Sequence, residues 1–443
     1  MVSRKTYSNL INQAEVLNEE ETNKVVEFEN YIKDIKRYKE YTSTSFTEEV
    51  SNGYDSQIAF LKSLKERNGN QSDALGRSTK IIPIESKLEE LEKAFPVIMI
   101  TGSRQVGKTT LLTVLQKEEN KINYISLDNI QIRALAIEDP ELFLERYKPP
   151  LIIDEFQYAP NLLSYIKIIV DKKRQEHLEN EKIQSAGLYY LTGSQVFHTM
   201  KNISESLAGR VGILQLYPLS NREIENKKDD MFLPSYENLE KREKTQRVEI
   251  DEIYQKILKG GFPELYSNKN VEPKDFFETY IRTYIERDIR ELINVKDEIK
   301  FLKFVESIAA RTGQELNIND ISNSVEINNM TAQNWLSILV NTGLVYLLQP
   351  YYNNNVSRIV KRPKIYFMDT GLACFLAGYM DSQTLEKSAY NGAIFETYVV
   401  TEIIKSFANQ GLDSRKYLYY YRDNNGKEID LLILYNNVMY PIE

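Results

Sequence analysis

One short segment of this sequence combines the residue types that bind nucleotide phosphates. Residues 102–109, Gly-Ser-Arg-Gln-Val-Gly-Lys-Thr, match the pattern G-x4-G-K-[ST]. The glycines let the backbone wrap tightly enough for its N–H groups to point at phosphate oxygens. The Lys108 ammonium would reach the β- and γ-phosphates, and the Thr109 hydroxyl would be a ligand of Mg²⁺. The sequence therefore predicts that ATP with Mg²⁺ binds to Gly102, Ser103, Arg104, Gln105, Val106, Gly107, Lys108, Thr109 and Thr110.

Two acidic residues that follow an apolar run support the same interpretation. The run Leu-Ile-Ile at 151–153 is followed by Asp154 and Glu155, as in a buried strand that ends in carboxylates. Asp154 would hold Mg²⁺ through a water molecule, and Glu155 would polarise the attacking water of a hydrolysis reaction. The alternative is a strand that ends in a solvated acidic turn, which the nearby P-loop makes the weaker interpretation. Lys108 and Glu155 are therefore the first expected catalytic residues.

Three further polar residues belong to the predicted site. Ser194 ends the run Leu-Thr-Gly-Ser and would sense the γ-phosphate, although Thr-Gly-Ser also makes an ordinary turn. Arg210 could reach the γ-phosphate of a neighbouring subunit as an arginine finger. It could equally be a surface arginine or the partner of an acidic residue, and both interpretations stay open. Arg104, inside the P-loop, is expected to face solvent.

The hydrophobic pattern supplies the strand before the P-loop and the helix after it. Short apolar runs with β-propensity predict strands at residues 96–100, 124–127, 151–153, 187–191 and 211–216. Helices are predicted between them, at residues 84–95, 109–116, 130–137 and 162–179. Strands that alternate with helices indicate a parallel α/β sheet.

Composition narrows the remaining possibilities. The chain has 443 residues, enough for two to four domains, and a net charge of −8, so it is not a polycation that coats nucleic acid. A single cysteine, Cys374, excludes an internal disulfide framework and a cysteine-based zinc site. With only His177 and His198 in addition, any metal is expected on oxygen ligands. No signal peptide and no run of about 20 apolar residues is present, so we expect a cytoplasmic protein with no membrane partner.

The motifs in their order resemble a known family. The segments GSRQVGKTTLL, YISLDN, LIIDEFQYAPNLLSYIK, YYLTGSQ and ESLAGRVGILQLYPLSNREI look like those of bacterial and archaeal AAA-fold ATPases that carry a restriction-endonuclease-like C-terminal domain. Residues 260–264, 284–288 and 369–371 resemble the linking region of that family. The similarity runs from about residue 82 to the end, whereas residues 1–80 and 226–248 depart from it. The resemblance implies an AAA-type ATPase of undefined substrate.

Residues 301–368 have the pattern of a winged helix. Helices are predicted at residues 317–325 and 330–342, and wing strands at residues 345–348 and 364–367. A basic cluster suited to phosphate contact lies nearby, formed by Arg358, Lys361, Arg362 and Lys364. DNA is therefore a possible partner. The alternative is a packed helical lid that carries Trp335 in its core and contacts only protein.

Three carboxylates near the end of the chain resemble the PD-(D/E)XK nuclease core. Glu396 lies on a predicted helix at 392–408, Asp430 on a predicted strand and Glu443 thirteen residues later. In such nucleases the clustered carboxylates bind Mg²⁺, and a lysine two residues past the last acid supports the attacking water. The sequence stops at Glu443, before that lysine. We therefore expect a truncated domain, a weak second metal site and no nuclease activity in this chain.

The sequence as a whole predicts an α/β P-loop domain of the AAA type with appended modules. The expected divisions are an N-terminal polar extension at 1–80, the AAA-type domain at 81–225, a charged insertion and helical lid at 226–300, a winged-helix-like domain at 301–368 and the incomplete PD-(D/E)XK-like domain at 369–443. The first functional hypothesis is an ATP-hydrolysing switch or motor, alone or as a homo-oligomer, acting on its C-terminal modules or an unknown protein partner. The alternatives are an ATP-regulated DNA-binding protein or nuclease, and a signalling scaffold that binds nucleotide without hydrolysis.

Overall fold

The computed structural model describes most of the chain after residue 81. The described residues are 82–119, 122–193, 207–227, 230–235, 238–239, 248–283, 298–351, 362–423 and 427–443. All of them belong to one unit, Ile81–Glu443. Several predictions lie outside the described residues, namely those for residues 1–80 and 284–288, Ser194, Arg358 and Lys361.

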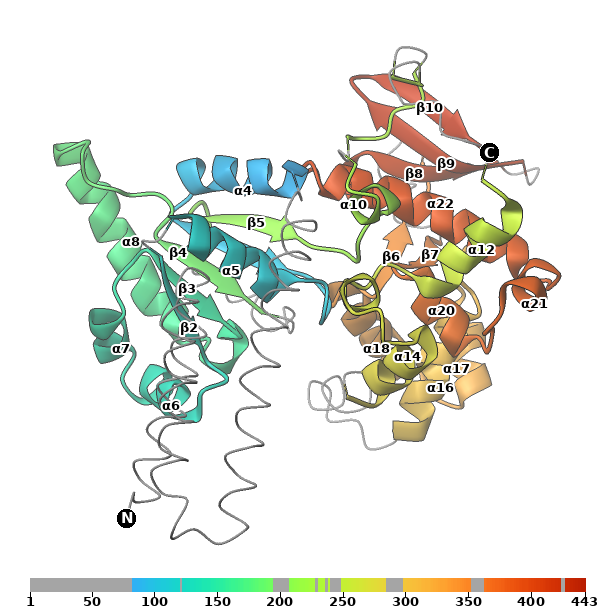
Figure 1. The fold of residues 1–443 in the computed structure, drawn as a ribbon, viewed down its shortest axis with the longest axis horizontal. Coiled ribbons are helices and arrows are strands. Elements are labelled where there is room, and N and C mark those ends of the chain that lie inside the picture. Colours follow the sequence, from blue (N-terminus) through green and yellow to red (C-terminus); the bar gives the residue numbers. More distant parts are fainter. Residues whose placement is uncertain are drawn as a thin grey trace, which may run out of the picture. The chain divides into compact units, whose positions relative to one another are not determined.

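A five-stranded parallel sheet forms the first part of this unit (Figure 1). Its strands are β1 (Val97–Thr101), β2 (Asn123–Ser126), β3 (Leu151–Asp154), β4 (Tyr189–Thr192) and β5 (Val211–Gln215). They lie in the order β2-β3-β4-β1-β5, and every neighbouring pair is parallel. The five predicted strands are therefore confirmed. All five carboxyl ends lie at the same edge, where α/β sheets bind their ligands.

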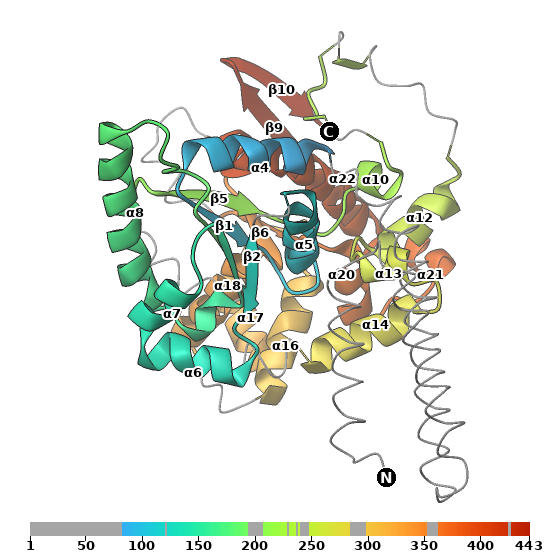
Figure 2. The ribbon, with the colours of Figure 1, turned by 60° about the vertical axis from the view of Figure 1, so that its left-hand side comes forward.

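Helices cover both faces of this sheet (Figures 1 and 2). Successive apolar side chains of β1 point to opposite faces, so both faces must be covered to bury them. Ile98 and Ile100 pack with α4 and α5, whereas Val97 and Met99 pack with α7 and α8. Both sets are almost fully buried, which explains why the strand is apolar throughout. The helices of this part are α4 (Ile82–Ala94), α5 (Lys108–Glu119), α6 (Ile130–Glu138), α7 (Pro140–Arg146) and α8 (Leu162–Glu179), with a 3-10 turn, η1 (Phe156–Tyr158), after β3.

Helices and one hairpin follow the sheet. They are α10 (Asn221–Ile224), α12 (Ile250–Lys259), α13 (Glu264–Ser267), α14 (Pro273–Tyr280), α16 (Glu298–Ala309), α17 (Ile318–Val325), α18 (Asn329–Asn341), and strands β6 (Val345–Leu348) and β7 (Lys364–Phe367), which pair antiparallel. The predicted helices at 317–325 and 330–342 and both wing strands are confirmed as elements. Trp335 lies in the core, edge-on to Phe301 and Phe304. The grouping of these helices and strands as a winged helix stays a prediction.

A helical segment and a small antiparallel sheet complete the unit. They comprise α20 (Thr370–Leu376), α21 (Ser382–Glu386), α22 (Asn391–Ala408), η3 (Ser414–Lys416), β8 (Leu418–Arg422), β9 (Glu428–Tyr435) and β10 (Val438–Ile442), in the sheet order β10-β9-β8. The predicted helix at 392–408 and the predicted strand that carries Asp430 are both confirmed as elements. The assignment to a restriction-endonuclease-like domain stays a prediction. None of the helices in the described ranges is long and apolar enough to cross a membrane.

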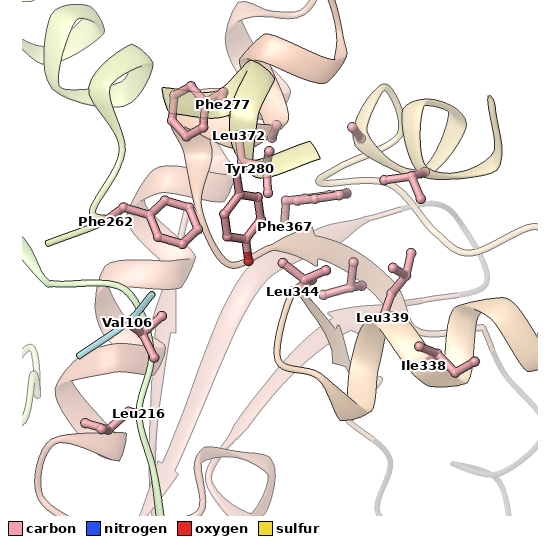
Figure 3. Packing of buried hydrophobic residues seen from close by; sticks show 14 of the residues in the cluster. Val106, Leu216, Phe262, Phe277, Tyr280, Ile338, Leu339, Leu344, Phe367 and Leu372 are labelled. Carbon is pink, nitrogen blue, oxygen red and sulfur yellow. The ribbon is translucent and has the colours of Figure 1, made fainter. Parts of the chain in front are cut away.

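The P-loop side of the sheet and the later helices share one hydrophobic core (Figure 3). Val106 of the P-loop and Leu216, just after β5, belong to the same cluster as Phe262, Tyr280 and Leu344. All five side chains are buried. The phosphate-binding loop is therefore packed directly against the helical region.

Candidate functional site

The P-loop connects β1 to α5 through a turn that only glycine permits at its start. Gly102 has a φ of +145°, and a Cβ atom there would lie 2.2 Å from the backbone oxygen of Leu216. Gly107, directly before α5, has a φ of +96°. The loop therefore wraps around the N-terminus of a 12-residue helix, where free N–H groups and the helix dipole favour phosphate. The structure thus brings the predicted loop residues into the form of an anion site.

Lys108 lies folded over its own loop. Its ammonium group donates to the carbonyl oxygens of Gly102 at 2.9 Å and Ser103 at 2.7 Å, and the residue is only 7% exposed. Burial lowers the pKa of Lys108 to about 8, although the nearby carboxylates of Glu155 and Asp154 oppose that shift. A phosphate group would give this ammonium the compensating charge that two carbonyl dipoles supply only in part.

Asp154, the last residue of β3, is bonded to residues of β2, β4 and the helix after the P-loop. Its carboxylate accepts hydrogen bonds from Thr109 at 3.1 Å, from Tyr124 of β2 at 2.7 Å and from Thr192 of β4. These contacts exist because β2 and β4 flank β3 in the parallel sheet. Burial and the bond to Asp154 raise the pKa of Tyr124, so its hydroxyl remains a donor. Thr109 and Asp154, the two predicted Mg²⁺ ligands, therefore lie side by side.

Glu155 occupies a special backbone position directly after β3. Its φ of 53° and ψ of 41° are left-handed, which is uncommon for a residue with a side chain. Its half-buried carboxylate accepts a hydrogen bond from the Gln157 amide. Burial raises the pKa of Glu155 and Asp154 adds to this, while Gln157, Arg104 and Lys108 oppose it. The predicted general base thus lies beside the predicted metal ligand.

Arg104 differs from its prediction. The residue is half-buried instead of facing solvent, and its Nε atom is shielded from water. Its charge lies close enough to lower the pKa of Glu155. The reason is that the P-loop turns back toward β3, which brings Arg104, the third loop residue, near the acidic pair.

Arg210 forms a bidentate ion pair with Asp171 of α8. The Nε and Nη2 atoms donate to the two carboxylate oxygens at 2.6 and 3.0 Å. The hydrogen bond from Arg210 lowers the pKa of Asp171. Within this chain Arg210 is therefore a paired arginine, as one of the two interpretations required. Its role as an arginine finger stays a prediction.

Lys364 was predicted to be part of a basic, phosphate-contacting cluster, and this prediction is wrong. The side chain is 5% exposed and forms ion pairs with Glu396 at 2.9 Å, Glu428 at 2.5 Å and Asp430 at 3.2 Å. Its charge is neutralised by carboxylates from α22 and β9, so it is not available for phosphate. Of the described residues in the predicted cluster, Arg362 is exposed.

The second predicted metal site, Glu396 with Asp430 and Glu443, is not formed. Ile442 pairs with Leu431 on β9, so the register places Glu443 across from Asp430. However, Lys364 lies between Glu396 and Asp430 and binds both. Across the ranges that the structure describes, no three His, Cys, Asp or Glu side chains come together in a group that could hold a metal ion. The buried ammonium takes the place that a cation would need.

Three residues of the site were missed by the sequence analysis. Tyr124, Gln157 and Thr192 bond to Asp154 or Glu155 from β2, from η1 and from β4. Tyr124 and Thr192 lie in runs that were predicted as strands, or directly at their ends. Because the carboxyl ends of parallel strands meet at one edge, polar residues at those ends were the available signal. The order of the strands, which decides their contacts, was not predicted.

Three family models match consecutive parts of the chain. Residues 94–225 match a model described as an AAA domain. Residues 250–383 match a domain of unknown function, DUF8612, and residues 391–443 match another, DUF4143. The chain therefore carries an AAA-type P-loop domain, followed by a helical region and small antiparallel sheets.

Individual proteins show more distant similarity. The proteins named uncharacterized protein Rv2008c of Mycobacterium tuberculosis and uncharacterized protein Mb2031c of Mycobacterium bovis are each 26% identical over 349 residues, which cover 79% of this chain and 70% of theirs. Among solved structures, the Aeropyrum pernix ORC2 protein in ADPNP–ADP complexes is 16% identical with a TM-score of 0.32, covering 75% of this chain and 93% of its own. A Thermotoga maritima RuvB mutant is 17% identical with a TM-score of 0.26, covering 63% and 89%.

Proposed function

We propose that this protein binds ATP with Mg²⁺ at the P-loop and hydrolyses it, as a switch that acts on its own C-terminal modules. The observation that carries the proposal is the convergence of Lys108 and Thr109 from the P-loop with Asp154 and Glu155 from β3. The two oxygens that would hold Mg²⁺, the Thr109 hydroxyl and one carboxylate oxygen of Asp154, already lie 3.1 Å apart. Oxygen donors of this kind suit Mg²⁺, so the residues present fit the ion.

The chain's own residues divide the chemistry between them. When bound, Mg²⁺ neutralises part of the charge on the phosphates. The P-loop N–H groups and Lys108 bind the phosphate oxygens, and burial makes each of these contacts stronger than in water. Glu155 orients the attacking water and accepts its proton. Burial raises the pKa of Glu155, which makes its carboxylate a stronger base for this role.

The proposed switch rests on contacts between the P-loop and the helical region. Val106 shares a core with Phe262 and Leu344. A Cβ atom placed on Gly107 would lie 4.0 Å from Pro263, and one placed on Gly343 would lie 3.7 Å from the Ser103 nitrogen. If phosphate binding shifts the P-loop, the loop therefore presses on two separate segments of the helical region, one at Pro263 and one at Gly343. Packed contacts of this kind transmit small shifts because a filled core cannot absorb them.

Nucleotide binding tests the site assignment. We expect Lys108→Ala to weaken the binding of Mg-ATP by at least tenfold in equilibrium titrations with a fluorescent ATP analogue, because the charge that faces the phosphates is lost. Lys172→Ala removes an exposed lysine on α8 and is expected to leave binding unchanged. Equal affinity of the Lys108→Ala variant and the wild type would contradict the assignment.

A further inference from the structure

The side chain of Gln157 is held between the predicted general base and the end of β4. Gln157 lies in η1, two residues after Glu155, and its Nε2 atom donates to the Glu155 carboxylate. The left-handed backbone at Glu155 turns the chain so that η1 folds back toward this carboxylate. The backbone path therefore places the Gln157 side chain next to the Glu155 carboxylate.

Gly193 provides the space that the Gln157 amide occupies. A Cβ atom on Gly193 would lie 2.5 Å from Oε1 and 3.6 Å from Cδ of Gln157. Within the described part of the chain, no other atom beyond the glycine's chain neighbours comes within 4 Å of that position. The φ of Gly193 is not in the left-handed region, so the backbone itself would accept alanine. The absence of a side chain at position 193 thus serves the amide of Gln157.

The orientation of the amide follows from the charge of Glu155. The NH₂ group must face the carboxylate, because the reversed amide would set two oxygen atoms against each other. Oε1 then points toward Gly193, shielded from solvent and without a hydrogen-bond partner among the described residues. A buried acceptor without a partner costs about 1–3 kcal/mol. An arrangement that keeps this cost is expected at a functional site.

We propose that Gln157 is a positioning residue for Glu155, and that Gly193 is the space that allows it. This inference rests on the proposed ATPase function. The Glu155 side chain has several rotatable bonds, and the single hydrogen bond from Gln157 selects among their conformations. A general base must be held within a fraction of an ångström of its productive position. Gln157 supplies this restraint through its hydrogen bond to the carboxylate.

A double-mutant cycle tests the proposal in the full chain. Gln157→Ala removes the amide, and Gly193→Ala places a methyl group where Oε1 lies, so each is expected to lower kcat for Mg-ATP hydrolysis about tenfold or more with ATP affinity unchanged. The double variant is expected to have the same kcat as Gln157→Ala, because the methyl group then has free space. Gln157→Glu keeps the side-chain length but replaces the donor with a repelling carboxylate, and should lower kcat in the same way.

Matched controls separate positioning from general damage. Gly392→Ala adds a methyl group in open space on α22, and Gln131→Ala removes an exposed amide on α6. Both should leave kcat unchanged. The inference would be overturned if the loss of kcat in the double variant equals the product of the two single losses. It would also be overturned if kcat is unchanged in both Gln157 variants. In either case, turnover by the wild type would still uphold the proposed function. A wild type without any turnover would overturn both, because a positioning residue needs a base to position.

Discussion

Two of the buried lysines in the described residues, Lys108 and Lys364, differ in the groups that surround their charge. Lys108 is bonded to two backbone carbonyls, and burial lowers its pKa to about 8. Burial also acts to lower the pKa of Lys364, but the hydrogen bonds that its ammonium group donates to Glu428 and Glu396 outweigh burial, so that pKa is raised. The ammonium group of the first lysine is bonded to no carboxylate in the described part of the chain, although Glu155 and Asp154 lie near it, and it is suited to receive a phosphate. The second already has its counter-charges and is structural.

Replacement of Lys364 should therefore be costly in a pH-dependent way. Lys364→Met leaves Glu396, Glu428 and Asp430 without their cation, and we expect the free energy of unfolding at pH 7 to fall by about 3 kcal/mol. The three carboxylates then repel, and the pKa of the Glu396 carboxyl, which burial already raises, loses the lowering effect of Lys364 and rises further above its value in the unfolded chain. Groups with raised folded pKa values bind protons first in the folded state. The loss should therefore shrink as the pH falls toward about 5.

Denaturant unfolding of wild type and variant between pH 5 and pH 8 measures this difference. The wild-type ammonium stays charged across that range because its pKa is raised. Lys256→Met is the control, since Lys256 is 33% exposed and pairs with Glu225 and Glu252 at the surface, so its loss should cost less than about 1 kcal/mol. A cost for Lys364→Met that is constant with pH would contradict the account.

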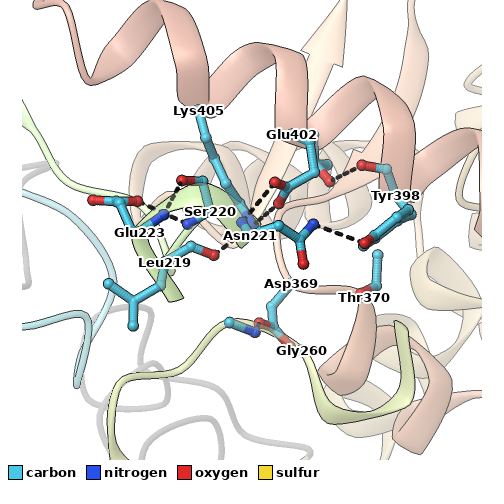
Figure 4. A network of polar contacts seen from close by, with 12 residues as sticks. Leu219, Ser220, Asn221, Glu223, Gly260, Asp369, Thr370, Tyr398, Glu402 and Lys405 are labelled. Carbon is cyan, nitrogen blue, oxygen red and sulfur yellow. Dashed lines mark hydrogen bonds and ion pairs between the residues drawn. The ribbon is translucent and has the colours of Figure 1, made fainter. Parts of the chain in front are cut away.

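At the scale of elements, one buried carboxylate joins the loop after α12 to the start of α20 (Figure 4). Asp369 accepts hydrogen bonds from the backbone nitrogen of Gly261 at 2.7 Å and of Leu372 at 2.8 Å. Gly261 in turn accepts from the nitrogen of Leu219, at the end of the sheet domain, at 2.7 Å. Lys405 of α22 also donates to Leu219, at 3.1 Å. The elements around the helical region are thus tied together by two charged side chains that bond to backbone groups.

Gly260 should be the most sensitive position of this joint. Its φ is +69°, and a Cβ atom would lie 2.3 Å from Oδ1 of Asp369. We expect Gly260→Ala to lower the free energy of unfolding by about 3 kcal/mol, from backbone strain and the displaced carboxylate together. Thermal unfolding checks this against Gly392→Ala, which should be neutral or slightly stabilising in its exposed helix. Equal melting temperatures for the two variants would contradict the role of the joint.

The elements themselves were largely predictable from the sequence, whereas their contacts were not. The helix at residues 162–179 and the strand at residues 345–348 have the predicted bounds, because local hydrophobic patterns report which face is buried. The role of Lys364 was predicted wrongly because a local pattern shows only neighbours in sequence. Its neighbours in sequence are basic, but the acids that surround it come from 32 to 66 residues away. Tyr124 and Thr192 meet Asp154 only because β3 lies between β2 and β4.

At the scale of the whole described unit, the P-loop and the helical region should respond to nucleotide together. We expect a non-hydrolysable ATP analogue to slow amide hydrogen exchange both in residues 102–109 and around Phe262 and Leu344, because Val106 belongs to the same buried cluster as these two residues. Lys108→Ala should remove both effects. Exchange that changes only within residues 94–225 would contradict the switch and leave a simple nucleotide-binding domain.

A variant with a shortened Val106 side chain gives the matching control for this experiment. Val106→Ala keeps the P-loop pattern but removes buried methyl groups from the hydrophobic cluster that the loop shares with the helical region. We expect ATP affinity to stay within about threefold of wild type, while the exchange response around Phe262 weakens. An undiminished response there would show that the coupling takes another route.

The most direct test of the central claim is steady-state phosphate release by the full chain with Mg-ATP, measured beside Glu155→Gln. The amide keeps the size of the side chain but cannot accept the proton of the attacking water. We predict measurable turnover in the wild type and a loss of about 100-fold or more in the variant, with ATP still bound. Equal phosphate release by the two proteins would contradict the assignment of Glu155 and, with it, hydrolysis at this site.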